Sequence, residues 1–102
     1  MARKVRFRAS AEADLFALYD YIADVAGRRI AGDYIGRIEA ACMQLETFPE
    51  RGTRRDDLAP GLRTVGFERR VTIAFRVLAD AVEIVAIAYA GRDFTAEVSK
   101  DE

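Results

Sequence analysis

Two apolar stripes of helical spacing follow closely on each other in the first half of the chain, with Gly27 between them. Apolar residues recur at steps of three and four over residues 11–25 and again over residues 31–48, as on one face of a helix. Gly27 is predicted to end the first helix, and Pro49 the second, because proline cannot continue the hydrogen-bond ladder. Amphipathic helices joined so closely are expected to form an antiparallel hairpin.

Polar residues mark the beginning of the first helix. Ser10 stands where an N-cap belongs, directly before the first apolar residue of the stripe. Glu12 and Asp14 follow in the first turn, where carboxylates favour the positive end of the helix dipole. The first helix is therefore predicted to begin directly after Ser10.

The spacing of the apolar residues changes from helical to alternating in the second half of the chain. Residues 50–61 are predicted to form a loop, and Glu68-Arg69 a turn between two strands. The last strand is apolar at nearly every position, which is typical of a central strand buried on both faces. The predicted strands lie at Leu62–Phe67, Val71–Val77 and 82–89.

These elements define a fold class. Val5 and Phe7 alternate with charged residues and predict a short strand before the helices. The order is then strand, helix, helix and a three-stranded antiparallel meander. We expect an α+β fold in which the helical hairpin covers one face of the sheet. A single domain is expected over residues 4–94, with a flexible tail over 95–102.

Composition excludes several kinds of site. The chain has 102 residues, no histidine and one cysteine, Cys42, so it lacks the usual general base and cannot assemble a Cys/His zinc site. We expect no metal and no cofactor, and Cys42 is expected to be a small buried apolar residue. No apolar run approaches the ~18 residues that span a bilayer, so no membrane contact is expected and a cytoplasmic location is predicted.

Arginine is concentrated in one part of a chain whose net charge is only −1. Six arginines stand among the 22 residues 49–70. Arg63, Arg76 and Arg92 are predicted to converge on one surface of the sheet, where guanidinium groups would suit a phosphate or a carboxylate. The alternative for the loop arginines is local pairing with neighbouring carboxylates: Glu50, Asp56, Asp57 and Glu68. For Tyr89, packing against the core is the alternative to a place beside these arginines.

Five short motifs occur in a characteristic order. SAEADL follows the first strand, FPERG ends the second helix, and PGLR, FRV and GRD come later. In this combination the chain resembles the ParE branch of the RelE/ParE toxin superfamily from about Val5 to Phe94. The resemblance implies a bacterial type II toxin neutralised by an antitoxin from the same operon. Such antitoxins typically carry a ribbon–helix–helix head, as ParD does, so operator DNA would be contacted only through the antitoxin.

The resemblance leaves the mode of action open between two branches. RelE-like relatives cut mRNA in the ribosomal A site with several Lys and Arg side chains and a C-terminal tyrosine. In this chain Val65, Thr72 and Val98 stand about where such groups are expected. We therefore predict no catalytic residues and inhibition of DNA gyrase by protein–protein contact. The alternatives are a ribonuclease, which would use Arg63, Arg76, Arg92 and Tyr89, and a non-toxic antitoxin-binding module.

Candidate binding residues follow from the same pattern. Apolar residues off the main stripes of the two helices are predicted to line a groove for an amphipathic antitoxin helix, unless they only widen the core. Arg54 and Arg55 are expected to meet an acidic segment of the same partner. The predicted antitoxin-binding set is Phe16, Tyr19, Ala23, Ile35, Arg54 and Arg55, and the predicted functional surface is Arg63, Arg76 and Arg92.

Overall fold

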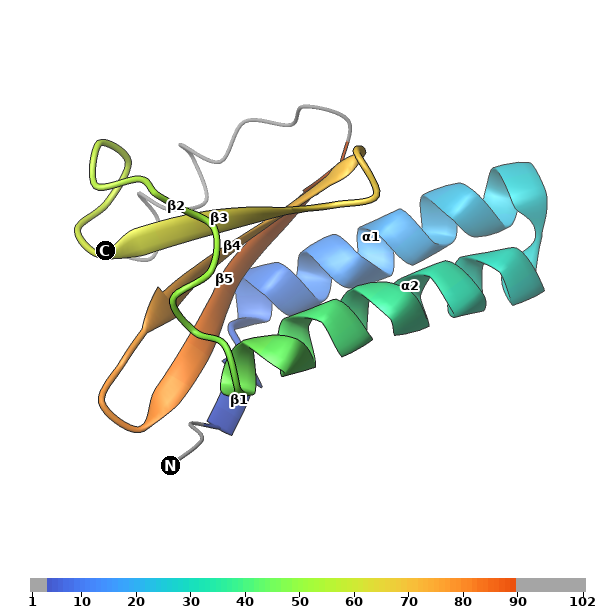
Figure 1. The fold of residues 1–102 in the computed structure, drawn as a ribbon. Helices are drawn as coiled ribbons and strands as arrows, with labels where there is room; N and C mark the ends of the chain where they lie inside the picture. The colour runs from blue at the N-terminus through green and yellow to red at the C-terminus, as the bar shows by residue number, and fades with distance from the viewer. Residues whose placement is uncertain (1–3, 90–102) are drawn as a thin grey trace.

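A computed structural model of the protein describes residues 4–89 and has the α+β architecture expected from the sequence (Figure 1). The two helices form a hairpin that lies on one face of the sheet. The elements of the whole fold, in chain order, are β1 (Lys4–Phe7), α1 (Ala9–Ala26), α2 (Arg28–Met43), the short 3-10 helix η1 (Gln44–Glu46), β2 (Thr53–Arg54), β3 (Leu62–Phe67), β4 (Val71–Val77) and β5 (Ala81–Tyr89).

The sheet has five strands in the order β1-β5-β4-β3-β2. All neighbours are antiparallel except β1 and β5, which run parallel. Strand β5 lies between two others and most of its residues are buried, as predicted for a central strand. The prediction of an uninterrupted loop over 50–61 was wrong, because β2 pairs Thr53 with Thr64 and Arg54 with Arg63. Two residues are too few for an alternating pattern to reveal a strand.

Gly27 is the only residue between the two helices, and it ends α1 as predicted. Its φ of 95° lies in the region that glycine tolerates, which lets the chain reverse within one residue. The second helix therefore begins at Arg28, directly after Gly27. It ends at Met43, and Phe48 lies beyond the helices with 56% of its surface exposed. The prediction of a helix through Phe48 was wrong, because the chain passes from α2 into the short 3-10 helix η1, which ends at Glu46.

The N-cap of α1 is Arg8 rather than Ser10, so that prediction was also wrong. Ser10 lies within the first turn and its hydroxyl donates a hydrogen bond to the carbonyl of Val85, at 2.8 Å. Asp14, only 6% exposed, accepts a hydrogen bond from the backbone N–H of Ile87, at 2.9 Å. Both contacts lie on β5 just past the point where its pairing with β1 ends, at Ile84. Two side chains of α1 thus bind the backbone of β5 beyond the point where β1 stops pairing with it.

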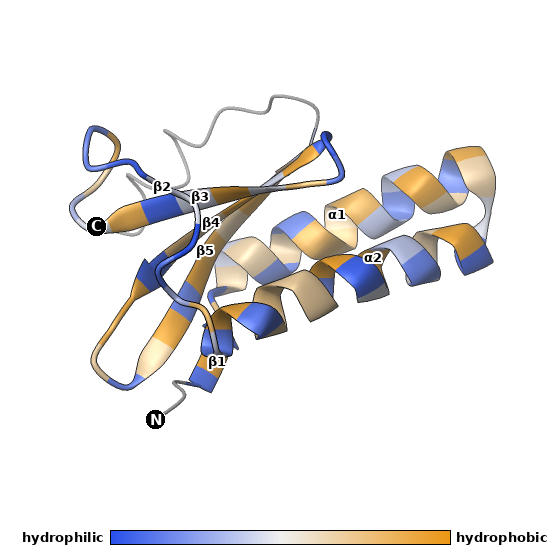
Figure 2. Cartoon of the chain, in the orientation of Figure 1, coloured by the Kyte–Doolittle hydropathy of each residue, from blue (hydrophilic) through white to orange (hydrophobic). Residues whose placement is uncertain are grey.

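The main core lies between the hairpin and the sheet, where apolar bands of the helices meet those of β4 and β5 (Figure 2). Phe75, Ile38 and Leu45 are its largest fully buried side chains. Cys42 is buried here, as expected, and burial raises the pKa of its thiol to about 12. Leu62, Ala74 and Val85 belong to a smaller apolar cluster apart from the main core. Within residues 4–89, no helix is long and apolar enough to cross a membrane.

Candidate functional site

An open groove runs along the helical hairpin, with walls from both helices. It has a volume of about 400 Å³. Phe16 and Tyr19 are three residues apart on α1, so they lie on the same face, and Ile35 lines the groove from α2. Phe16 is 73% exposed, a large apolar side chain left in water. The lining residues are Glu12, Leu15, Phe16, Tyr19, Asp20, Ile35 and Glu39.

Three of the four apolar residues predicted to form an antitoxin groove are thus brought together. The fourth, Ala23, lies one helical turn beyond Tyr19 and lines the adjoining hollow. Tyr19, Ala23 and Ile35 are also half-buried against the main core, whereas Phe16 is not part of that cluster. Tyr19 and Ile35 therefore widen the core and line the groove at once, Ala23 widens the core and lines the adjoining hollow, and Phe16 contributes only to the groove surface.

The rim of this groove is acidic. Glu12 and Asp20 lie on α1 and Glu39 lies on α2, all three exposed. The groove lining includes no lysine or arginine. Among residues 4–89, no ion pair joins any of these three carboxylates to a cation. The sequence contained this signal, because all three residues flank the apolar positions at helical spacing.

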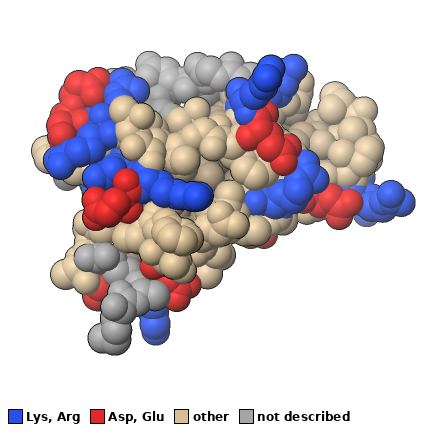
Figure 3. Space-filling model, viewed as in Figure 1, with Lys and Arg blue, Asp and Glu red and all other residues tan. Residues whose placement is uncertain are grey.

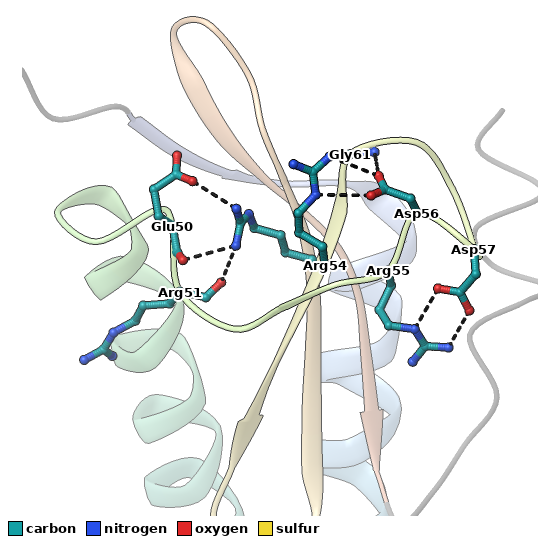
Figure 4. A network of polar contacts seen from close by, with 8 residues as sticks. Glu50, Arg51, Arg54, Arg55, Asp56, Asp57 and Gly61 are labelled. Carbon is teal, nitrogen blue, oxygen red and sulfur yellow. Dashed lines mark hydrogen bonds and ion pairs between the residues drawn. The ribbon is translucent and has the colours of Figure 1, made fainter.

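The loop arginines are paired with carboxylates two residues further along the chain (Figure 4). Arg54 donates two hydrogen bonds to Asp56, at 3.1 and 3.3 Å, and Arg55 donates two to Asp57, at 3.0 and 2.9 Å. Asp56 also accepts from the N–H of Gly61. The hydrogen bond from Gly61 is the main cause of a lowered pKa for Asp56, and the bonds from Arg54 come second. The bonds from Arg55 lower the pKa of Asp57. Local pairing, the alternative considered from the sequence, is confirmed for these two arginines.

Arg63 holds the beginning of the loop against β3. Its guanidinium donates to the carbonyl of Glu50 at 3.1 Å, to that of Arg51 at 3.4 Å and to the carboxylate of Glu50 at 2.9 Å. The Arg63 side chain is only 16% exposed. The FPERG and PGLR motifs are therefore bonded to each other, and Arg63 is occupied within the chain.

The predicted convergence of Arg63 and Arg76 was wrong. Arg63 pairs with Phe75, which faces the helices, whereas Arg76 pairs with Leu62 in the smaller cluster. Paired residues share a face of a sheet and successive residues alternate, so the two arginines lie on opposite faces. Arg92, Val98 and the predicted tail over 95–102 lie outside the described residues.

The register explains this difference. A two-residue turn at Glu68-Arg69 would have paired Arg63 with Ala74 and placed it on the face of Arg76. The turn extends to Arg70, whose N–H donates to the carbonyl of Glu68, and Phe67 pairs with Val71. One additional turn residue moves every side chain of β3 to the other face relative to β4.

Other charged and aromatic groups are also engaged within the fold. In the sheet register Arg76 on β4 lies opposite Glu83 on β5. The Glu83 carboxylate forms ion pairs with Arg6 at 3.8 Å and with Arg8 at 3.2 Å. Tyr89 packs at the core, with its ring 5.9 Å from that of Tyr21, in agreement with the packing alternative. On the face drawn in Figure 3, basic and acidic side chains lie next to each other.

One contact between α2 and the turn after β3 was not anticipated. Arg37 donates two hydrogen bonds to Glu68, at 3.1 and 3.2 Å, and its guanidinium lies 5.2 Å from the centre of the Tyr34 ring. Glu68 thus pairs with a helix arginine, not with the loop arginines considered from the sequence. Residues 4–89 contain no group of three carboxylate, cysteine or histidine side chains placed to hold a metal ion.

The arrangement can be compared with known proteins. The model of the family described as "ParE toxin of type II toxin-antitoxin system, parDE" matches residues 5–94. The chain belongs to this ParE toxin family. A curated relative, Toxin ParE3 of Caulobacter vibrioides, is 29% identical over 100 residues, which are 98% of each chain.

Solved structures agree with this assignment. A chain of the chromosomal ParDE toxin–antitoxin system from P. aeruginosa matches with a TM-score of 0.77 and 27% identity, over 87% of this ParE-family chain and 97% of that one. A mutant of the E. coli toxin RelE in the free state matches with a TM-score of 0.70 over 99% and 98% of the two chains. The RelE identity is only 12%, so this likeness shows the fold alone.

Proposed function

We propose that the chain is the toxin of a type II pair, that it inhibits DNA gyrase by protein–protein contact, and that a ParD-like antitoxin neutralises it. Membership of the ParE family supports the toxin role. The separation of Arg63 from Arg76 on opposite faces carries the argument against a ribonuclease. Groups that steady one phosphate must act from one side, and here one of them is bonded to Glu50.

The hairpin groove is the proposed seat of the antitoxin. An amphipathic helix binds a groove through apolar anchors at steps of three and four, and Phe16, Tyr19 and Ile35 offer a matching apolar floor. Burying a side chain such as Phe16 contributes roughly 1.5–3 kcal/mol to an interface. Phe16 is therefore the proposed anchor point of the complex. Its exposure makes it replaceable without a large effect on the fold.

Arg54 and Arg55 are a secondary part of this proposal. Each lies beside a carboxylate of its own loop, so an acidic segment of a partner would have to displace Asp56 or Asp57. Exposed pairs of this kind are worth about 0–1 kcal/mol, which a partner carboxylate can replace without net loss. We therefore expect these arginines to affect the rate of association more than the affinity.

A gyrase supercoiling assay with the purified chain, with and without its antitoxin, tests the proposal. The expected result is that the chain inhibits gyrase and that the antitoxin relieves this inhibition. An Arg63→Lys variant should inhibit gyrase as well, because the lysine ammonium can still donate to the loop carbonyls. Ribosomes programmed with mRNA form the second arm. Cleavage of ribosome-bound mRNA by the chain, with gyrase unaffected, would refute the proposal and favour the ribonuclease. Normal growth of cells that express the folded chain alone would instead favour a non-toxic module.

A further inference from the structure

The groove on the hairpin is framed by carboxylates on both of its sides. We propose that the partner helix seated there carries lysine or arginine side chains on each side of its apolar stripe, an inference that rests on the proposed function of the groove. Glu12 and Asp20 flank the apolar floor from α1, and Glu39 flanks it from α2. An occupant must place its own flanking residues against the carboxylates of both helices.

Four other acidic groups on the surface differ from these carboxylates. Asp56, Asp57, Glu50 and Glu68 each have an arginine partner within the chain. Glu12, Asp20 and Glu39 have no ion-pair partner among residues 4–89. Their charges therefore remain uncompensated around an apolar floor, and this concentrates negative potential in the groove.

The adjoining hollow continues the same pattern with one exception. Asp20 lines both hollows, and Asp24 lies one turn further along α1, where Arg28 is the single cation. The acidic rim is therefore strongest over the stretch from Glu12 to Asp20. Eight helical steps separate these two residues, which corresponds to about 12 Å, or two turns of a partner helix.

This length and charge define the partner chemistry. Two turns accommodate apolar anchors at positions i, i+3 or i+4, and i+7, and the positions beside them face Glu12 and Asp20 on one side and Glu39 on the other. A helix with acidic flanks would place like charges opposite each other and be disfavoured, whereas basic flanks would form up to three ion pairs. The groove thus selects for a basic amphipathic helix, whatever segment of the partner meets the loop arginines.

Two synthetic peptides test the inference with the full chain. Each has about 15 residues, a length that supports helix formation, and the same leucine stripe; one has lysine flanks and the other has glutamate flanks. Fluorescence anisotropy at low salt should show the lysine peptide binding about tenfold more tightly, from three exposed ion pairs of modest strength. The difference should shrink as salt is added, because exposed charges are screened.

Matched variants separate the rim from the floor. The triple change Glu12→Gln, Asp20→Asn and Glu39→Gln should abolish the preference for lysine flanks while the apolar floor remains. The double change Asp56→Asn and Asp57→Asn, in the loop, should leave the preference intact. Phe16→Ala should weaken both peptides alike, and circular dichroism should confirm that each variant is folded.

Several outcomes would overturn the inference. Equal binding of the two peptides, tighter binding of the glutamate peptide, no binding of either, or a lysine preference that survives the rim variant would each do so. Growth arrest and gyrase inhibition by the unmodified chain are measured separately. A chain that prefers the lysine peptide but fails to inhibit gyrase would refute the proposed target and leave the groove chemistry standing.

Discussion

Gly52 lies where the chain after η1 passes close to β3, and replacing it with alanine should destabilise the protein more than the same change at Gly61. A Cβ at position 52 would lie 2.2 Å from the carbonyl oxygen of Thr64, a backbone atom of β3. At position 61 a Cβ would meet nothing within 4 Å. The φ values are similar, 80° and 75°, so the backbone strain is matched.

The expected losses in the free energy of unfolding follow from comparing these two glycines. Placing a non-glycine residue at positive φ costs roughly 1–2 kcal/mol, and both variants incur it. Gly52→Ala must also move the loop away from β3, which weakens the bonds from Arg63 to the loop carbonyls, at about 1 kcal/mol each. We expect a loss of about 3–4 kcal/mol for Gly52→Ala and about 1–2 kcal/mol for Gly61→Ala, from these terms together.

Urea denaturation followed by far-ultraviolet circular dichroism measures both variants under identical conditions. The free energy of unfolding should fall for both, with the larger fall for Gly52→Ala. Since the β3 backbone is held by its ladder with β4, the loop is the part that must move. Equal losses for the two variants would refute the reasoning, because the contact with Thr64 would then carry no cost.

Three further predictions concern buried and charged groups. Asp14→Ala should lower the free energy of unfolding by about 2–3 kcal/mol because the buried N–H of Ile87 loses its acceptor, whereas Asp14→Asn, which keeps an oxygen there, should lose about 1 kcal/mol; equal losses in thermal unfolding would contradict this. Cys42 should resist alkylation at pH 8 in the folded protein and react after unfolding, since its pKa is raised to about 12; rapid modification of the native protein would contradict this. The pKa values of Asp56 and Asp57 are lowered in the folded state, so their contribution to stability is present above the ordinary carboxyl pKa and is lost as the pH falls through the lowered, folded-state values. NMR titration of the two carboxyls should show this, and Asp56→Asn with Asp57→Asn should flatten the acid limb of the stability curve.

The helices and main strands could be predicted because their signals are local. The stripes on α1 and α2 repeat at helical spacing, and Gly27 marks the junction between them in the sequence as in the structure. The groove residues could be predicted for the same reason, since Phe16 and Tyr19 lie off the core stripe of one helix. Local pairing of Arg54 with Asp56 was likewise foreseeable from a separation of two residues.

The remaining features depend on contacts between distant parts of the chain. Ser10 meets a carbonyl 75 residues away and Asp14 an amide 73 residues away, and no local pattern encodes such partners. The face of Arg63 depends on whether the turn after Phe67 contains two residues or three, a difference that turn sequences containing neither glycine nor proline leave open. The candidate functional surface failed at this point because it required the register of the hairpin.

The single-residue junction at Gly27 also affects where proteases can cleave the chain. From Ala9 to Glu46 it is the only residue outside a helix, so this stretch contains no extended segment of the length that a protease active site requires. Arg28, Arg29 and Arg37 are trypsin sites by sequence, yet each lies within α2. Among residues 4–89, limited digestion should therefore begin in the segment between η1 and β3, which carries Arg54 and Arg55, and spare the hairpin. The hairpin, which carries the surface proposed to bind the partner helix, would then persist in the digest after that segment is cut.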